Sequence, residues 1–113
     1  MAKKLLSKKQ INTLIKKLSE KVKEDNIFFQ KVFVFGSYAK NKMTSRSDLD
    51  LCFVSSKFKD TIEAEAYLRT KLYFLNLNYK VPIDIVAYSP KEFKETIPLV
   101  DEIKKSGREF RAS

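Results

Sequence analysis

Two aspartates, one residue apart, open an apolar segment of the chain, SDLDLCFV at residues 47–54. In a β-strand, residues two apart project from the same face about 6.6 Å apart, so Asp48 and Asp50 would direct their carboxylates to one side. Two neighbouring anions among apolar residues are unfavourable unless a cation lies between them. Mg²⁺ suits that position because it prefers oxygen ligands and combines one or two carboxylates with substrate phosphates. The pair therefore predicts a Mg²⁺ site.

A third acidic residue, Asp84, stands between two isoleucines in a separate apolar segment, VPIDIVAY at residues 81–88. Three carboxylates on two strands would suit phosphoryl transfer at a two-metal site, with ions ~4 Å apart holding nucleophile and leaving group. Each acid also has a structural interpretation: Asp48 could cap a turn, Asp50 could pair with a lysine, and Asp84 could lie at a sheet edge. The three acids together favour the catalytic interpretation.

A glycine and a serine, Gly36 and Ser37, end the apolar run VFVF that precedes the aspartates. Glycine permits unusual backbone angles and, without a Cβ, lets an anion approach the chain closely. Ser37 would add a hydroxyl and a backbone N–H at the start of a short helix, whose N-terminal dipole favours phosphate. Such pairs usually mark ordinary turns, so the phosphate interpretation depends on the aspartates nearby.

The elements that would position these residues follow from periodicity and capping patterns. Helices are predicted over residues 8–25, 61–75, 90–96 and 98–106, with a further short helix after Ser37. Strands are predicted over residues 31–35, 49–54 and 81–88. This alternation indicates an α/β (α+β) fold, a small mixed sheet of about three strands flanked by helices.

The bulk composition limits the classes of function. A chain of 113 residues is expected to form one domain over residues 1–113, without room for a separate substrate domain. It has no apolar run of the ~20 residues that would span a membrane and no segment typical of a signal peptide, so we expect a cytoplasmic protein. The single cysteine, Cys52, lies in an apolar segment and is expected to be a buried thiol.

A formal net charge of +9 raises the possibility of a polyanionic partner such as nucleic acid. Lysine dominates the basic residues, whereas specific reading of bases and phosphates relies more on arginine. The phenylalanines fall mostly in strand or core positions, where they cannot form a stacking platform for bases. We therefore expect solvated helix faces, with nucleic acid unlikely as the main partner.

The spacing of these residues resembles the signature of the DNA polymerase beta-like nucleotidyltransferase superfamily. The matching positions are Gly36, Ser37, Ala39, Ser47, Asp48, Leu49, Asp50 and Leu51, followed by Asp84 as the third acid. The short length, the helix start SPKEF and the ending EIKKSGREF resemble its minimal nucleotidyltransferases, the antitoxin partners of HEPN ribonucleases. The resemblance covers nearly the whole chain and implies a nucleotidyltransferase fold.

The resemblance also implies a role for each motif residue. Gly36 and Ser37 would hold the terminal phosphates of ATP. Asp48 and Asp50 would coordinate Mg²⁺, and Asp84 would complete a second metal site and help to deprotonate the acceptor hydroxyl. The reaction would be in-line attack on the α-phosphate with pyrophosphate leaving, promoted by positioning and charge neutralisation.

The loop between the two motifs adds basic residues and one departure from the family pattern. Lys40, Lys42 and Arg46 would neutralise triphosphate charge. Asn41 stands where the family commonly has glycine. Asparagine also tolerates left-handed backbone angles, so the turn is expected to survive, with phosphate affinity open to change.

Three functions follow as hypotheses. The first is an active Mg²⁺-dependent protein adenylyltransferase that moves AMP from ATP to a hydroxyl of a HEPN toxin, its partner in a hetero-oligomer. The second is a catalytically silent antitoxin that neutralises its partner by binding alone, and the third is a nucleic-acid-binding module. The three retained acids favour the enzyme, because an occluding protein gains nothing from their mutual repulsion.

Overall fold

A mixed sheet organises the computed structural model, which describes residues 5–44 and 47–110. Its strands are β1 (Lys31–Phe35), β2 (Leu49–Val54), β3 (Ile83–Tyr88) and β4 (Arg108–Phe110). They lie in the order β3-β2-β1-β4. Strand β1 is antiparallel to both β2 and β4, whereas β2 and β3 are parallel. The α/β fold class is as predicted, but the sheet has four strands rather than about three.

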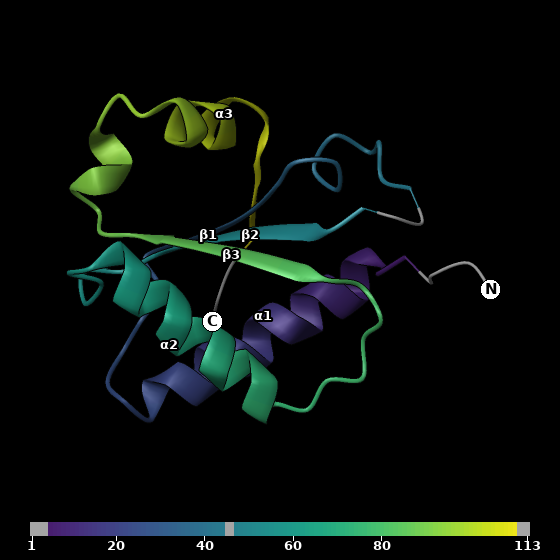
Figure 1. Cartoon of the computed structure of the whole chain (residues 1–113), viewed down its shortest axis with the longest axis horizontal. Coiled ribbons are helices and arrows are strands. Elements are labelled where there is room, and N and C mark those ends of the chain that lie inside the picture. Colours follow the sequence, from purple (N-terminus) through teal and green to yellow (C-terminus); the bar gives the residue numbers. More distant parts are fainter. Residues whose placement is uncertain (1–4, 45–46, 111–113) are drawn as a thin grey trace.

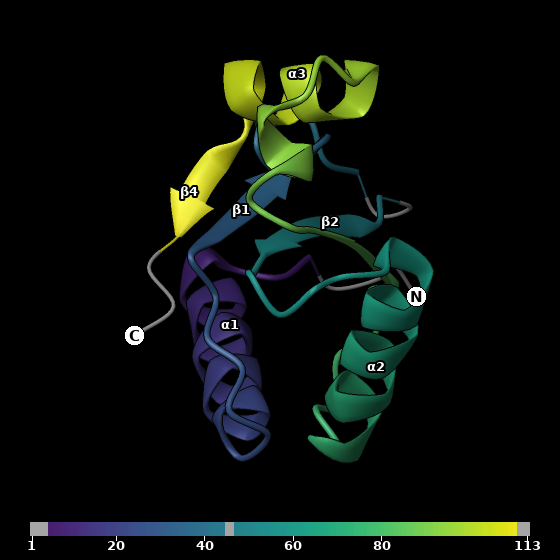
Figure 2. The same ribbon diagram turned by 90° about the vertical axis from the view of Figure 1, so that its left-hand side faces the viewer.

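Helices cover both faces of this sheet. They are α1 (Lys8–Lys23), α2 (Thr61–Phe74) and α3 (Pro98–Ser106), with a single 3₁₀ turn, η1 (Glu92–Lys94). Helices α1 and α2 lie on one face, and η1 and α3 lie on the other, as Figure 2 shows most clearly. Within the described parts of the chain, no helix has both the length and the apolar character needed to cross a membrane.

Helix α1 forms for the local reasons that predicted it. Ser7 accepts a hydrogen bond from the backbone N–H of Gln10, and the Gln10 side chain accepts one from the N–H of Ser7, which completes a capping box. The predicted apolar stripe faces the sheet, and its residues are buried: Ile11, Leu14, Ile15, Leu18 and Val22.

Two predicted helices are shorter than expected. The helix expected over residues 90–96 is only the 3₁₀ turn η1: Ser89 and Glu92 form the hydrogen bonds of a capping box, but the backbone becomes extended at Glu95 and ends the turn. The short helix expected after Ser37 is a hydrogen-bonded turn over residues 36–41. Asn41 has a φ of 56°, which ends that turn before a helix can propagate.

The pleat of the strands creates two apolar layers. Alternate residues such as Val32, Val34 and Leu51 pack toward α1 and α2, whereas Phe33 and Phe35 pack toward α3. Figure 1 shows these helices on opposite sides of the sheet. By the same alternation, Asp50 and Asp84 project from the α3 face of the sheet. Two of the three predicted acids therefore share one face.

Candidate functional site

The parallel pairing of β2 and β3 places two acids side by side. Asp50 lies directly opposite Asp84 in the register of the two strands. On its other side Asp50 lies opposite Phe35, the last residue of β1. Gly36 follows immediately, so the Gly-Ser turn and the two carboxylates meet at one end of the sheet.

Gly36 and Asp50 lie too close together for any side chain at position 36. The φ of Gly36 is 70°, in the left-handed region that favours glycine. A Cβ added there would overlap Oδ2 of Asp50 and lie 3.2 Å from its Cγ. Backbone conformation and space therefore both require glycine, which lets the Asp50 carboxylate lie directly against the backbone of the turn.

Hydrogen bonds hold the turn after Gly36 in place. The N–H of Lys40 donates to the carbonyl of Gly36 (3.2 Å), and the N–H of Lys42 donates to the carbonyl of Ser37 (2.9 Å). Tyr38 is buried, and its hydroxyl accepts from the N–H of Leu6 at 3.2 Å. Among the described residues, the backbone N–H groups at positions 37–39 have no acceptor. Free N–H groups at the first turn after a strand suit an anion.

Asp50 carries charge that its surroundings do not compensate. Partial burial, together with the negative charges of Asp84, Asp48 and Glu102, raises the pKa of Asp50 to about 6. A cation bound nearby would favour the deprotonated form of this carboxyl group.

Asp48 and Asp84 differ in their settings. Asp48 immediately precedes β2 and is exposed. Asp84 lies on the outer strand, where its Oδ1 is 4.0 Å from Nη2 of Arg69. Arg69 reaches it from α2 and also donates to the carbonyl of Ile85 at 3.4 Å. Both side chains are more than half exposed, so the ion pair is weak.

The carboxylates of the candidate site suit a hard cation, although they do not converge on one position. Among residues 5–44 and 47–110, no three Asp, Glu, His or Cys side chains are positioned to hold a metal ion together. Carboxylate oxygens are nevertheless the ligands that Mg²⁺ prefers, and an added cation would relieve the repulsion that raises the pKa of Asp50. Metal binding at this site would require side-chain rotation.

The basic loop residues do not all point to the site. Nζ of Lys40 lies 3.7 Å from Oε1 of Glu102 on α3, while Lys42 is exposed. Arg46 lies outside the described residues. Arg69 and Glu102 could not be predicted from the sequence, because each comes from a helix remote from the motif and carries no local signal.

Cys52 is buried, as predicted. Burial raises the pKa of its thiol to about 12, with a smaller contribution from the charge of Glu65. A thiol that stays protonated at neutral pH is not a nucleophile.

Comparisons with known proteins agree with this geometry. Residues 14–110 match the family model described as a nucleotidyltransferase domain. No sequence among the curated proteins matches the chain.

Several solved structures share the fold. A protein from Sulfolobus solfataricus, described as a candidate nucleotidyltransferase, superposes with a TM-score of 0.57 at 20% identity, over 89% of this chain and 79% of that one. A toxin–antitoxin structure with AMP-PNP gives a TM-score of 0.57 at 18% identity, over 88% and 73%. A variant of the toxin–antitoxin pair MntA–HpeT gives a TM-score of 0.57 at 20% identity, over 96% and 75%. The match of the family model over most of the chain shows that this protein belongs to the nucleotidyltransferase domain family.

Proposed function

We propose that this protein is a Mg²⁺-dependent nucleotidyltransferase that transfers AMP from ATP to a hydroxyl of a partner protein, and that it acts as the antitoxin of a HEPN-type ribonuclease. The observation that carries the proposal is the meeting of Gly36, Asp50 and Asp84 at one end of the sheet. A glycine turn with free backbone N–H groups beside two acids is an arrangement that suits metal-assisted phosphoryl transfer.

Different residues of the chain would bind the metal and the phosphates. Asp48, Asp50 and Asp84 would hold Mg²⁺, which supplies charge neutralisation for the triphosphate. The free N–H groups that follow Gly36, together with the Ser37 hydroxyl, would bind the terminal phosphates. Their contribution is to fix the α-phosphate in line with the incoming hydroxyl.

The acceptor would approach from the side of β3. The acceptor oxygen bonds to the α-phosphorus as the bond to pyrophosphate breaks, and the hydroxyl proton passes to the Asp84 carboxylate and then to water. Asp84 is exposed on an outer strand, so a hydroxyl of a large partner can reach it. Arg69 beside it would help to orient its carboxylate.

The identity of the acceptor rests on the fold relatives and on the sequence resemblance. Two of the fold relatives are toxin–antitoxin structures, and one of them contains AMP-PNP. The minimal nucleotidyltransferase features of the sequence point in the same direction. A side-chain hydroxyl, such as that of tyrosine, would gain its reactivity from positioning by the protein interface.

A second function, neutralisation of the partner by binding alone, is favoured by one observation. Among the described residues, the acids do not form a ready three-ligand metal group. A protein that kept the fold but not the chemistry would need no such group.

One experiment separates the two functions. The protein is co-expressed with a HEPN-type toxin, its proposed partner, and the intact mass of that toxin is measured. We expect one or more AMP adducts with the wild type and with Glu20→Ala, an exposed control on α1, and none with Asp48→Ala. Protection from toxicity without an adduct would establish binding alone, and the absence of both would contradict the antitoxin role.

A further inference from the structure

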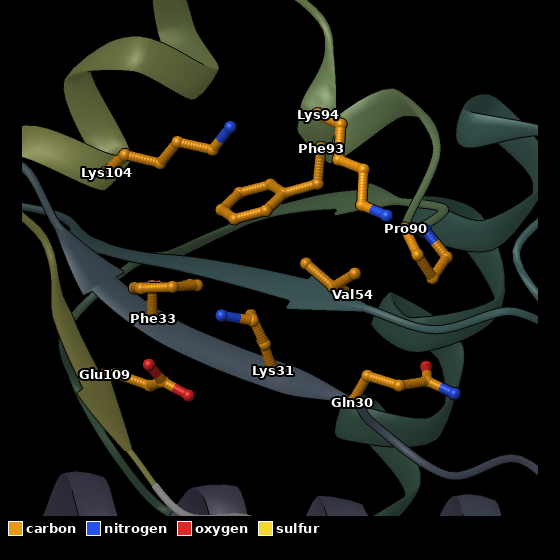
Figure 3. A pocket seen from close by; sticks show the side chains of 9 residues that line it. All are labelled: Gln30, Lys31, Phe33, Val54, Pro90, Phe93, Lys94, Lys104 and Glu109. Carbon is orange, nitrogen blue, oxygen red and sulfur yellow. The ribbon is translucent and has the colours of Figure 1, made fainter.

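A pocket lies at the opposite end of β1 from the candidate active site. Its volume is about 470 Å³, and it opens on the α3 face of the sheet, between the start of β1, η1 and α3 (Figure 3). Lys31, at the start of β1, lines it and pairs with Val54, whereas Asp50 pairs with Phe35 at the far end of the strand. The motif residues do not line this pocket, so the proposed reaction does not account for it.

The pocket has a rigid aromatic lining, with Phe33 on the sheet and Phe93 on η1 (Figure 3). The rings of Phe33 and Phe93 stack with their centroids 5.3 Å apart at an interplanar angle of 29°. Val54 and Pro90 extend this apolar surface along one side, as Figure 3 shows. All but the rim proline are largely buried, so the surface is held in place by the core. Such a surface suits a flat ring system.

The rim of the pocket is positively charged. Lys31, Lys94 and Lys104 come from three different elements, and Figure 3 shows their ammonium groups around the aromatic lining. Glu109 is the only acid that lines the described pocket, so three positive charges and one negative charge leave a net charge of +2.

These ammonium groups remain available to a ligand. Among the described residues, none of the three lysines lies within 4.0 Å of a carboxylate oxygen. Nζ of Lys104 lies 5.1 Å from the centroid of the Phe93 ring, which holds one positive charge next to the aromatic lining. Gathered lysines without acidic partners repel one another, and an anion would relieve that repulsion.

A fixed polar group completes the wall. Oε1 of Gln30 accepts from the N–H of Ser56 at 2.9 Å, and its Nε2 donates to the Ser56 hydroxyl at 3.2 Å. These two bonds hold the Gln30 side chain at the edge of the pocket, so little ordering is needed when a ligand binds.

We propose that this pocket binds a small aromatic anion: a flat ring system that carries one phosphate or carboxylate group and is about the size of a nucleoside monophosphate. The ring would lie against the apolar side chains that line the pocket, Phe33, Val54 and Phe93, and the anionic group would contact the lysines. The volume falls within the range of small-molecule sites. The proposal is independent of the transferase function, because it uses none of the acids.

The test compares three probes by two-dimensional ¹H–¹⁵N NMR, in EDTA so that no metal favours the acidic site. AMP carries both a ring and a phosphate, adenosine carries only the ring, and ribose 5-phosphate carries only the phosphate. We expect AMP to shift the amides of Lys31, Phe33 and Phe93, and to bind about tenfold more tightly than either fragment. Shifts confined to Gly36 and Ser37, or no shifts at millimolar AMP, would overturn the proposal.

Variants with matched charge complete the test. Lys31→Gln combined with Lys104→Gln should weaken AMP binding by about tenfold or more. Lys16→Gln combined with Lys23→Gln removes the same charge from exposed positions of α1, on the other face of the sheet, and should leave the affinity within twofold. Equal losses in the two double variants would show that only net charge matters and would refute a specific pocket. All four positions are exposed, so both variants should fold.

Discussion

At the residue scale, Gly36 shows how a single position controls the candidate site. Its φ of 70° and the closeness of Asp50 are separate demands, and each would exclude most residues by itself. Asn41 shares only the left-handed backbone conformation: its φ is 56°, and its position is exposed. Asparagine is adequate there because its side chain points into solvent rather than toward a carboxylate.

We predict that Gly36→Ala lowers the free energy of unfolding by about 2 to 4 kcal/mol, because it adds both backbone strain and a collision with Asp50. In an Asp50→Ala background the collision partner is gone, and the same substitution should cost only about 1 kcal/mol, the backbone part. Urea unfolding of the four proteins of this double-mutant cycle measures the difference. Equal costs in the two backgrounds would show that the carboxylate does not require the glycine.

At the element scale, the contact between α2 and β3 determines the setting of the third acid. Strand β3 lies at the edge of the sheet, so Asp84 would be fully solvated without its neighbour on α2. Arg69 comes across this edge to the carboxylate and to the carbonyl of Ile85. A cation that binds Asp84 must therefore compete with a guanidinium, although in a weak and exposed pair.

We predict that Arg69→Gln tightens Mg²⁺ binding roughly two- to fivefold, because it removes a positive charge next to one of the proposed ligands. Lys71→Gln is the matched control: Lys71 lies on the same helix, but its Nζ pairs with Asp25 at 3.1 Å. Calorimetric titration with Mg²⁺ measures both affinities. Weaker binding in Arg69→Gln would mean that Arg69 orients Asp84 for the metal more than it competes with it.

At the scale of the whole molecule, the candidate active site is a region of negative charge in a strongly basic chain. The formal net charge is +9, yet the charges that act most on Asp50 are those of three acids, from β3, α3 and the loop before β2. The lysines lie mostly on helix surfaces and do not compensate it. Folding therefore brings negative charges close together. Their repulsion lowers the free energy of unfolding until a cation binds.

We predict that this repulsion makes the free energy of unfolding depend on pH. The folded pKa of Asp50 is about 6 against an ordinary value of 3.8, so the folded state binds the proton more tightly than the unfolded state. The stabilising contribution of Asp50 is then complete below about pH 4 and is lost as the pH rises through 6. Asp50→Asn should match the wild type near pH 4 and exceed its stability by about 1 to 2 kcal/mol at pH 7.5, after allowance for solvent screening.

Urea unfolding in EDTA between pH 4 and pH 8 measures this difference. Mg²⁺ at pH 7.5 should raise the stability of the wild type and reduce the advantage of the variant, because a ligand of the native state stabilises by mass action. A difference between the two proteins that stays constant across the pH range would contradict the raised pKa.

The sequence by itself determined the features that depend on neighbours along the chain. The capping box at Ser7, the ranges of β1 and β2, and the left-handed angle of Asn41 all arise from interactions within a few residues. The motif spacing likewise located the acids and the glycine turn. These signals are readable because each is complete within one short segment.

Only the tertiary structure decided what distant segments do to one another. Strand β4 exists because β1 offers it a free edge, since its own sequence contains one apolar residue, Phe110. The parallel register brings Asp50 opposite Asp84, and the packing of α2 and α3 brings Arg69 and Glu102 to the site. The raised pKa of Asp50 and the lysine-rimmed pocket follow from these placements. Burial and charge proximity are properties of the assembled layers, so no local pattern in the sequence encodes them.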